Sequence, residues 1–448
     1  MKNKLIITLI LLASIMQAQD KKEKERYSFS LQQAITHAIE NNYSEINANR
    51  DIEAAKKKKW ETTTMGLPQI NGSVSYLNNL EYTKQGVTGG GAFGGTPGSV
   101  STIAFGTKHS INAGATLTQL IFDGSYLVGL QSAKVYLKIS ENAKLKTNQE
   151  IKEIVINSYG NVLLADESIA VLEKNKAILE KNVFDTNQTF KNGLIEEENV
   201  EQLQITLSSV NSALANVKRQ KTIAVNMLKL ILGIPLNTDL ELTEKLNELT
   251  QKNVDLQLLQ TEFKATNNID YQIGQNLQES KRLLLKLEKS KELPSLGAAL
   301  NYGYNAFENQ FDFFSKNQKW NNFANLGISL NVPLFSSFGT SARKQQAKIA
   351  LEQAKTNLTE TEQKLTLQFQ KAKSDYEYSI EQLATSKDNL KLAERIENKQ
   401  QIKFKEGLSS SFNLSEAQRQ LYAAQQNSLQ AMIDVINKKA ALEKLINK

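Results

Sequence analysis

The longest pattern in the chain is a heptad repeat of apolar and small residues, which predicts long coiled helices over 122–190 and 340–405. In both stretches the apolar positions advance by alternate steps of four and three. In the first they are Ile151, Val155, Ser158, Val162, Ala165, Ile169 and Leu172, and in the second Leu365, Phe369, Ala372, Tyr376, Ser379, Leu383, Ser386, Leu390 and Ala393. At about 1.5 Å per residue, 122–190 would be roughly 100 Å long, which no compact globule contains.

The chain also repeats itself once. Phe190-Lys-Asn-Gly193-Leu194 returns 214 residues later as Phe404-Lys-Glu-Gly407-Leu408, and Leu67-Pro68 returns as Leu293-Pro294. This duplication predicts two structural repeats, 19–232 and 233–448. We expect the long helices to end at the two glycines, which can take the left-handed backbone conformation, and shorter helices to follow over 196–232 and 412–447.

Each repeat contains two segments in which apolar and small polar residues alternate, which predicts strands at 69–82, 108–119, 295–305 and 323–332. Leu326, Ile328 and Leu330, for example, alternate with small or polar neighbours. Strands of about ten residues with one apolar face suit a water-filled barrel in lipid, although a half-buried sheet of a soluble protein has the same pattern. Four strands cannot close a barrel. Three copies would supply twelve strands. Two copies would supply only eight, and side chains fill the interior of an eight-stranded barrel.

Composition excludes several kinds of chemistry. The 448 residues include no Cys, so disulfides, thiolate metal sites and thiol nucleophiles are ruled out. His37 and His109 are the only histidines and have no ligand-like neighbours, so the sequence predicts no metal site, no cofactor and no enzymatic activity. Gly89-x-Gly91-x-x-Gly94 matches a dinucleotide fingerprint, but no strand or helix is expected around it.

The first residues have the order of a secretory signal peptide, predicted over 1–18, with Lys2 and Lys4 before the apolar run 5–16. The net charge of +7 becomes +5 without Lys2 and Lys4 and is spread along the helices, so nucleic acid is not an expected partner. Lys56–Lys59 before Trp60 could form a membrane-surface patch or simply a solvated helix end.

Taken together, these features resemble the TolC family of outer-membrane efflux ducts. The resemblance rests on the leader, the repeated Leu-Pro and Phe-x-x-Gly-Leu motifs, the duplication, and an opening helix that contains Leu31, Ala34, Ala38 and Asn41-Asn42. It implies a mainly α fold with a small β part. Three chains would form a twelve-stranded barrel in the outer membrane, continued by a coiled-helix tunnel across the periplasm.

The implied function is that of a passive exit duct of a tripartite efflux or type I secretion system. Its partners would be two further copies of the chain, outer-membrane lipid, a periplasmic adaptor (membrane fusion protein) and an inner-membrane pump of the RND or ABC type. A coiled-coil envelope protein with a structural or adhesive role and no conduit is the alternative.

The resemblance also implies a closed aperture held by acidic residues after the second glycine turn. The matching positions are Asn413 and Glu416, so one carboxylate is kept; the arginine and tyrosine of the family's lock are replaced by Ser409 and Phe404. Three copies of Glu416 near the axis would repel one another, raise their pKa and select cations. On the outer wall they would do neither.

Three further groups of residues are candidates. Glu196, Glu197 and Glu198 open a helix, where they could line the aperture or only complement the helix dipole. By the resemblance, the turns with Gly193, Leu194, Gly407 and Leu408 would dock the adaptor. A membrane-interface aromatic belt is predicted at Tyr76, Tyr82, Tyr302, Tyr304, Trp320 and Phe323.

Overall fold

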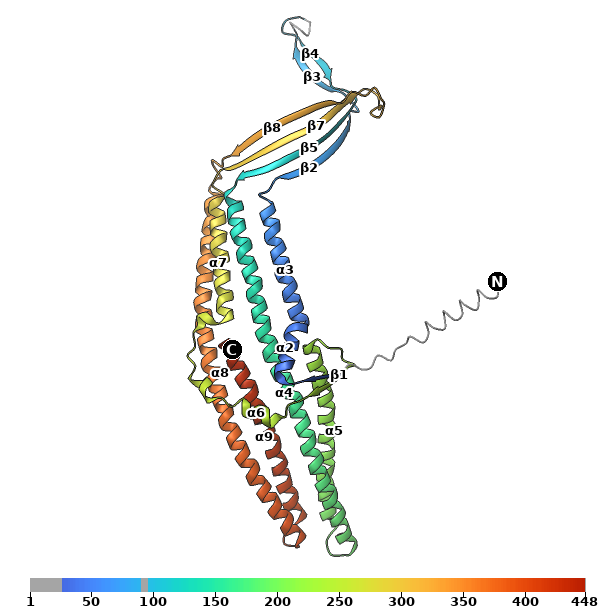
Figure 1. The fold of residues 1–448 in the computed structure, drawn as a ribbon, viewed down its shortest axis with the longest axis vertical. Helices are drawn as coiled ribbons and strands as arrows, with labels where there is room; N and C mark the ends of the chain where they lie inside the picture. The colour runs from blue at the N-terminus through green and yellow to red at the C-terminus, as the bar shows by residue number, and fades with distance from the viewer. Residues whose placement is uncertain (1–25, 90–95, 448) are drawn as a thin grey trace, which may run out of the picture. The chain divides into compact units, whose positions relative to one another are not determined.

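A computed structural model describes residues 26–89 and 96–447, so the predicted signal peptide 1–18 and most of the glycine fingerprint, which includes Gly91 and Gly94, lie outside the described residues. The chain falls into two compact units. Figure 1 labels the helices and strands that they contain. Unit 1 contains the described residues of 1–50, 141–273 and 359–448; unit 2 contains those of 51–140 and 274–358. The units therefore do not coincide with the two sequence repeats, because each unit takes residues from both repeats.

Four helices dominate unit 1. They are the C-terminal part of α4 (Gly124–Lys191), α5 (Glu198–Leu232), the C-terminal part of α8 (Gly339–Lys405) and α9 (Ser411–Leu445). All the heptad positions predicted for α4 and α8 are buried or half-buried, which is why such long helices are stable against their neighbours. Smaller elements complete the unit: β1 (Arg26–Phe29), α2 (Leu31–Asn41), the start of α3 (Tyr43–Thr64), β6 (Asp239–Leu242), α6 (Leu246–Lys252), η2 (Leu256–Gln260), η3 (Ala265–Asn267) and the start of α7 (Ile269–Ser290).

The main core of unit 1 surrounds Tyr159, which is fully buried on α4. Its hydroxyl donates to the backbone carbonyl of Phe29 at 3.0 Å, and burial raises the pKa of Tyr159 to about 12. Tyr376 on α8 is equally buried and donates to the carbonyl of Asn253 at 2.7 Å. Each long helix thus fixes a segment of connecting chain through one buried tyrosine. The parallel pair β1 and β6 was not expected from the sequence.

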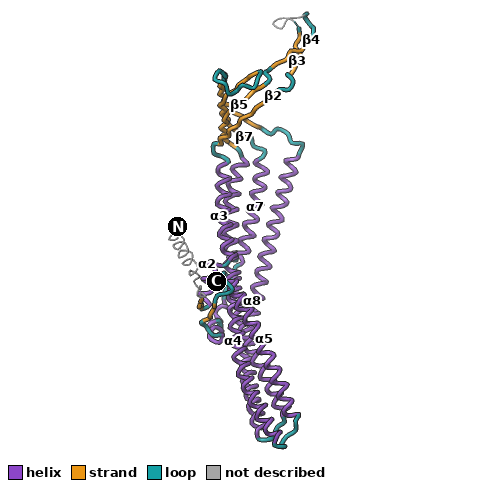
Figure 2. Tube along the Cα trace, turned by 90° about the vertical axis from the view of Figure 1, so that its right-hand side faces the viewer, coloured by secondary structure: helices purple, strands orange, loops and turns teal. Residues whose placement is uncertain are grey.

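Unit 2 contains a four-stranded antiparallel sheet in the order β2 (Gln69–Asn78), β5 (His109–Phe122), β7 (Ser295–Glu308), β8 (Asn321–Asn331). On one face the cross-strand neighbours are apolar, such as Ile70, Leu117, Leu300 and Leu326 in one row; the next row on the other face is Asn71, Thr116, Asn301 and Asn325. Helical parts of α3, α4, α7 and α8 lead to the strands (Figure 2). None of the described helices is both long enough and apolar enough to cross a membrane.

Several predicted boundaries differ from the structure. The strand expected over 69–82 ends at Asn78, because the side chain and backbone amide of Asn79 bond to Thr107 and Lys108 and close the sheet there. The strand expected over 108–119 continues to Phe122, and α4 starts at Gly124 instead of 122, since the Asp123 carboxylate accepts from the amides of Ser125 and Tyr126. The strands expected over 295–305 and 323–332 span 295–308 and 321–331.

No strand was expected around the glycine fingerprint, but the residues on either side of it form a hairpin of β3 (Thr83–Thr88) and β4 (Val100–Phe105). The helices expected over 196–232, 340–405 and 412–447 span 198–232, 339–405 and 411–445.

Candidate functional site

The two glycine turns that connect α4 to α5 and α8 to α9 have the same backbone geometry. Gly193 and Gly407 have φ values of +74° and +72°. At each turn the glycine amide donates to the carbonyl three residues earlier, and the following leucine amide donates to the carbonyl five residues earlier. This pair of bonds is the Schellman motif, which needs a left-handed residue and so favours glycine. The leucines point away from the helices, with 74% of Leu194 and 78% of Leu408 exposed.

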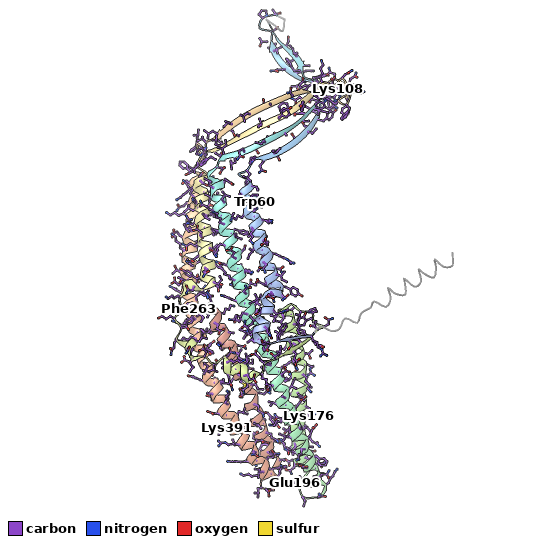
Figure 3. All side chains as sticks on the ribbon, viewed as in Figure 1. Trp60, Lys108, Lys176, Glu196, Phe263 and Lys391 are labelled. Atoms are coloured by element: carbon purple, nitrogen blue, oxygen red, sulfur yellow. The ribbon has the colours of Figure 1, made fainter. Side chains whose placement is uncertain are left out.

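The residues after the turns are held differently in the two hairpins. Ser410 caps α9 by accepting from the amide of Asn413 at 3.3 Å, and Asn413 itself is exposed. Glu196 (Figure 3), Glu197 and Glu198 are all exposed. Glu197 caps α5, and its side chain makes no cap hydrogen bond to a described residue. Glu198 in the first turn of α5 can still complement the helix dipole. The α5 and α9 starts are linked by the side chain of Asn199, which accepts from the amide of Ser411 at 3.4 Å.

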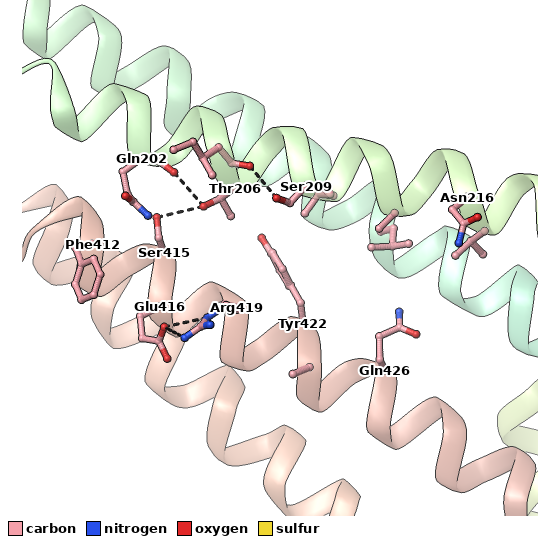
Figure 4. Close-up of a pocket in the computed structure, with 16 residues that line it drawn as sticks. Gln202, Thr206, Ser209, Asn216, Phe412, Ser415, Glu416, Arg419, Tyr422 and Gln426 are labelled. Carbon is pink, nitrogen blue, oxygen red and sulfur yellow. Dashed lines mark hydrogen bonds and ion pairs between the residues drawn. The ribbon is translucent and has the colours of Figure 1, made fainter.

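The Glu416 carboxylate has hydrogen-bond partners on its own helix, which the sequence analysis did not predict. The Arg419 guanidinium one turn later donates to Glu416 Oε2 through both Nε and Nη2 (Figure 4). Gln420 donates to Glu416 Oε1 at 2.9 Å. The Gln420 hydrogen bond, followed by that of Arg419, lowers the pKa of Glu416. The raised pKa was predicted for three copies of Glu416 around one axis; within a single chain, a cation three residues away on the same helix face acts in the opposite direction.

Glu416 lies at one end of a groove of about 750 Å³ between α5 and α9. Thr206 and Ser415 join the two helices through their hydroxyls at 3.4 Å, and Tyr422 points into the space between them (Figure 4). Burial raises the pKa of Tyr422, with a further contribution from Glu397 on α8. Burial also raises the pKa of Glu397, and the neighbouring Gln418 is fully buried. Glu397 of α8 and Gln418 and Tyr422 of α9 therefore form a polar layer where the two helices pack. The sequence did not predict this layer.

The predicted belt residues do not share one face of the sheet. Tyr302 and Tyr304 lie on the apolar face of β7, with their hydroxyls 2.9 Å apart, and Tyr76 lies on that face of β2. Phe323 pairs with Gly303 on the opposite, polar face, where its ring lies against Gly303 and Gly114. Phe323 must therefore be removed from the belt. Tyr82 and Trp320 lie outside the four strands and are exposed.

His109 and His37 have structural surroundings. The Tyr76 hydroxyl lies 2.8 Å from Nδ1 of His109, and His37 packs on Phe29 and Tyr27. Burial lowers the pKa of His37. Among the described residues no group of three His, Asp or Glu side chains is placed to hold a metal ion.

Comparison with known proteins decides the family. A family model described as outer membrane efflux protein matches residues 34–234 and 274–448. The chain belongs to the outer membrane efflux protein family. The outer membrane protein TolC of Vibrio cholerae is 23% identical over 328 residues, which are 73% of this chain and 74% of TolC.

Solved structures of outer-membrane channels share the fold of this efflux protein. CusC superposes with a TM-score of 0.74 at 16% identity, covering 93% of this chain and 92% of CusC. CmeC of Campylobacter jejuni superposes with a TM-score of 0.71 at 18% identity, covering 93% of this chain and 85% of CmeC. The efflux protein is thus mainly α with a small β part, and it is an outer-membrane exit duct and not an enzyme. The alternative of an envelope protein without a conduit has no support.

Proposed function

We propose that three copies of this efflux protein close a twelve-stranded barrel in the outer membrane and form one passive duct with an adaptor and an inner-membrane pump. The supporting observation is the sheet of unit 2. Among the residues that the structure describes, its outer strands β2 and β8 each pair on one side only. Its apolar face exposes Ile70, Val74, Leu326, Ile328 and Leu330. Unpaired backbone groups are costly in hydrocarbon, so the two edges must pair with neighbouring copies.

Native mass measurement in mild detergent tests this assembly. We expect a particle of three chains, because twelve strands leave a water-filled bore whereas eight do not. The same preparation should conduct ions after insertion into a planar bilayer. A stable monomer that does not conduct would contradict the proposal.

The two glycine turns, with Leu194 and Leu408, are the proposed adaptor-docking surface, and the starts of α5 and α9 are the proposed aperture. Support comes from the exposed leucines on two matching Schellman turns and from the polar residues that follow each turn: Glu196, Glu197, Glu198, Asn413 and Glu416. Tyr76, Tyr302 and Tyr304 remain in the proposed belt on the lipid-facing side, and Tyr82 and Trp320 would lie near its rim.

Changing Arg419 tests whether Glu416 faces the lumen. In Arg419→Ala the three Glu416 carboxylates would lose their cations, so we expect cation selectivity to increase in planar-bilayer conductance. In Glu416→Gln the arginines remain alone, and selectivity should shift toward anions. Arg395→Ala on α8 removes one exposed cation elsewhere and is the control. If neither change at 416 or 419 alters the reversal potential, the pair lies on the outer wall.

A further inference from the structure

The helical parts of unit 2 that adjoin the sheet carry a strong excess of positive charge. We call the stretches 51–64, 124–140, 274–293 and 339–358 the sheet-proximal segments. They contain fifteen Lys and Arg residues against seven Asp and Glu. The described residues of unit 1 show the opposite balance, with 29 Lys and Arg against 33 Asp and Glu. The sequence predicted charge spread along the helices. The structure instead shows an excess of positive charge in these segments of unit 2 and a slight excess of negative charge in unit 1.

Ion pairs within these segments leave several cations facing solvent. Pairs are present between Lys56 and Glu53, Lys58 and Glu61, Arg282 and Glu279, Lys291 and Glu288, Arg343 and Glu288, Lys344 and Glu292, and Lys355 and Glu352. Lys134, Lys289 and Lys348 are exposed and Lys59 is half-exposed, and none of the four has an ion pair with another described residue. Because one comes from each of α3, α4, α7 and α8, all four helices present an available cation.

The junctions between these segments and the strands expose large apolar side chains: Met65, Leu67, Leu293, Leu334, Phe335 and Phe338. Trp60 on α3 (Figure 3) is also exposed, and along the chain it lies between Lys59 and Met65. The farthest cation, Lys355, follows the start of α8 by 16 residues, or about 24 Å along the helix. Apolar groups, an amphipathic aromatic residue and then cations therefore follow one another away from the sheet.

We propose that the sheet-proximal segments bind anionic phospholipid headgroups of the leaflet from which the helices emerge. The proposal rests on the proposed function, since it needs the sheet to lie in a bilayer. An anionic leaflet attracts nearby Lys and Arg side chains, and Trp and Tyr favour its interface. A soluble anionic polymer would use the cations but would leave the apolar residues at the sheet junction in water, so the combination favours lipid.

Lipid selection by the purified full chain tests the proposal. The protein is equilibrated in neutral detergent with equal amounts of phosphatidylglycerol and phosphatidylcholine, and the retained lipids are measured by mass spectrometry after gel filtration. We expect wild type to retain phosphatidylglycerol about tenfold in excess. We expect most of that excess to be lost in one quadruple variant that combines Lys59→Gln, Lys134→Gln, Lys289→Gln and Lys348→Gln. The control removes four exposed lysines of unit 1: Lys174, Lys191, Lys391 and Lys399.

The outcomes separate this inference from the proposed function. Equal lipid selection by wild type and the sheet-proximal variant, or an equal loss in the control, overturns the inference. The inference is also overturned if the sheet-proximal variant no longer co-sediments with purified peptidoglycan but selects lipids as wild type does. The partner of the four lysines would then be an anionic polymer. Trimer mass and conductance in pure phosphatidylcholine test the duct independently, and their failure would overturn the proposed function.

Discussion

Replacing Gly233 with alanine is expected to lower the melting temperature of the purified assembly by several degrees. Gly233 ends α5 with φ at +73°, and a Cβ atom there would lie 2.2 Å from the carbonyl oxygen of Asn41 at the end of α2. Left-handed strain and the clash together should cost about 2 to 4 kcal/mol per chain. Asn42 donates to the carbonyl of Ile231 at 2.7 Å in the same place, so the contact cannot open without loss of that bond.

Gly327→Ala is the matched control for this change. Gly327 lies in β8, its φ is not positive, and a Cβ atom added there meets nothing within 4 Å. Its melting temperature should stay close to that of wild type. Equal melting temperatures for Gly233→Ala and Gly327→Ala would mean that the α2 and α5 contact relaxes without cost.

Valine at Gly193 and Gly407 is expected to abolish export while leaving the barrel assembled. A β-branched residue in the left-handed region costs about 1 to 3 kcal/mol, and the double variant carries that strain six times in a trimer. No atom of the described residues lies within 4 Å of a Cβ atom added to either glycine, so the effect isolates the backbone requirement. The measurement is intracellular accumulation of a fluorescent dye that the host retains when this chain is deleted, together with trimer mass.

Asparagine at the same two positions is the matched substitution, because it enters the left-handed region more readily than other residues with a Cβ atom. It should restore most of the export. Normal export by an intact valine trimer would exclude the two turns as the docking surface.

The sequence was most informative where structure depends on short-range periodicity. The boundaries of α8 and α9 lie within two residues of those expected, because an uninterrupted heptad pattern and a glycine define each helix. The β1 and β6 pair joins residues more than 200 positions apart, and nothing local in Arg26–Phe29 specifies that partner. The β3 and β4 hairpin was not predicted, because its glycine and serine residues weaken the alternation of apolar and polar positions.

The same division applies to the candidate site. The Schellman glycines were visible from the repeat, and the partner of Glu416 could have been found from the spacing of Arg419 alone. The layer of Glu397, Gln418 and Tyr422 could not, because it depends on how α8 packs against α9. Phe323 was misassigned although its own alternation with Ala324 and Leu326 already placed it on the polar face.

The interleaving of the two units along the chain has a consequence for biogenesis. A chain that enters the periplasm with its N-terminus first presents α4 long before α8 and α9 exist, although the α4 core residues Val155, Tyr159 and Val162 share a cluster with Ile433 and Ile436 of α9. Contacts between such distant residues form slowly, and the apolar seam stays exposed meanwhile. Neither unit can be completed from the first half of the chain, so the emerging polypeptide has to be shielded from aggregation until its last helix has been exported.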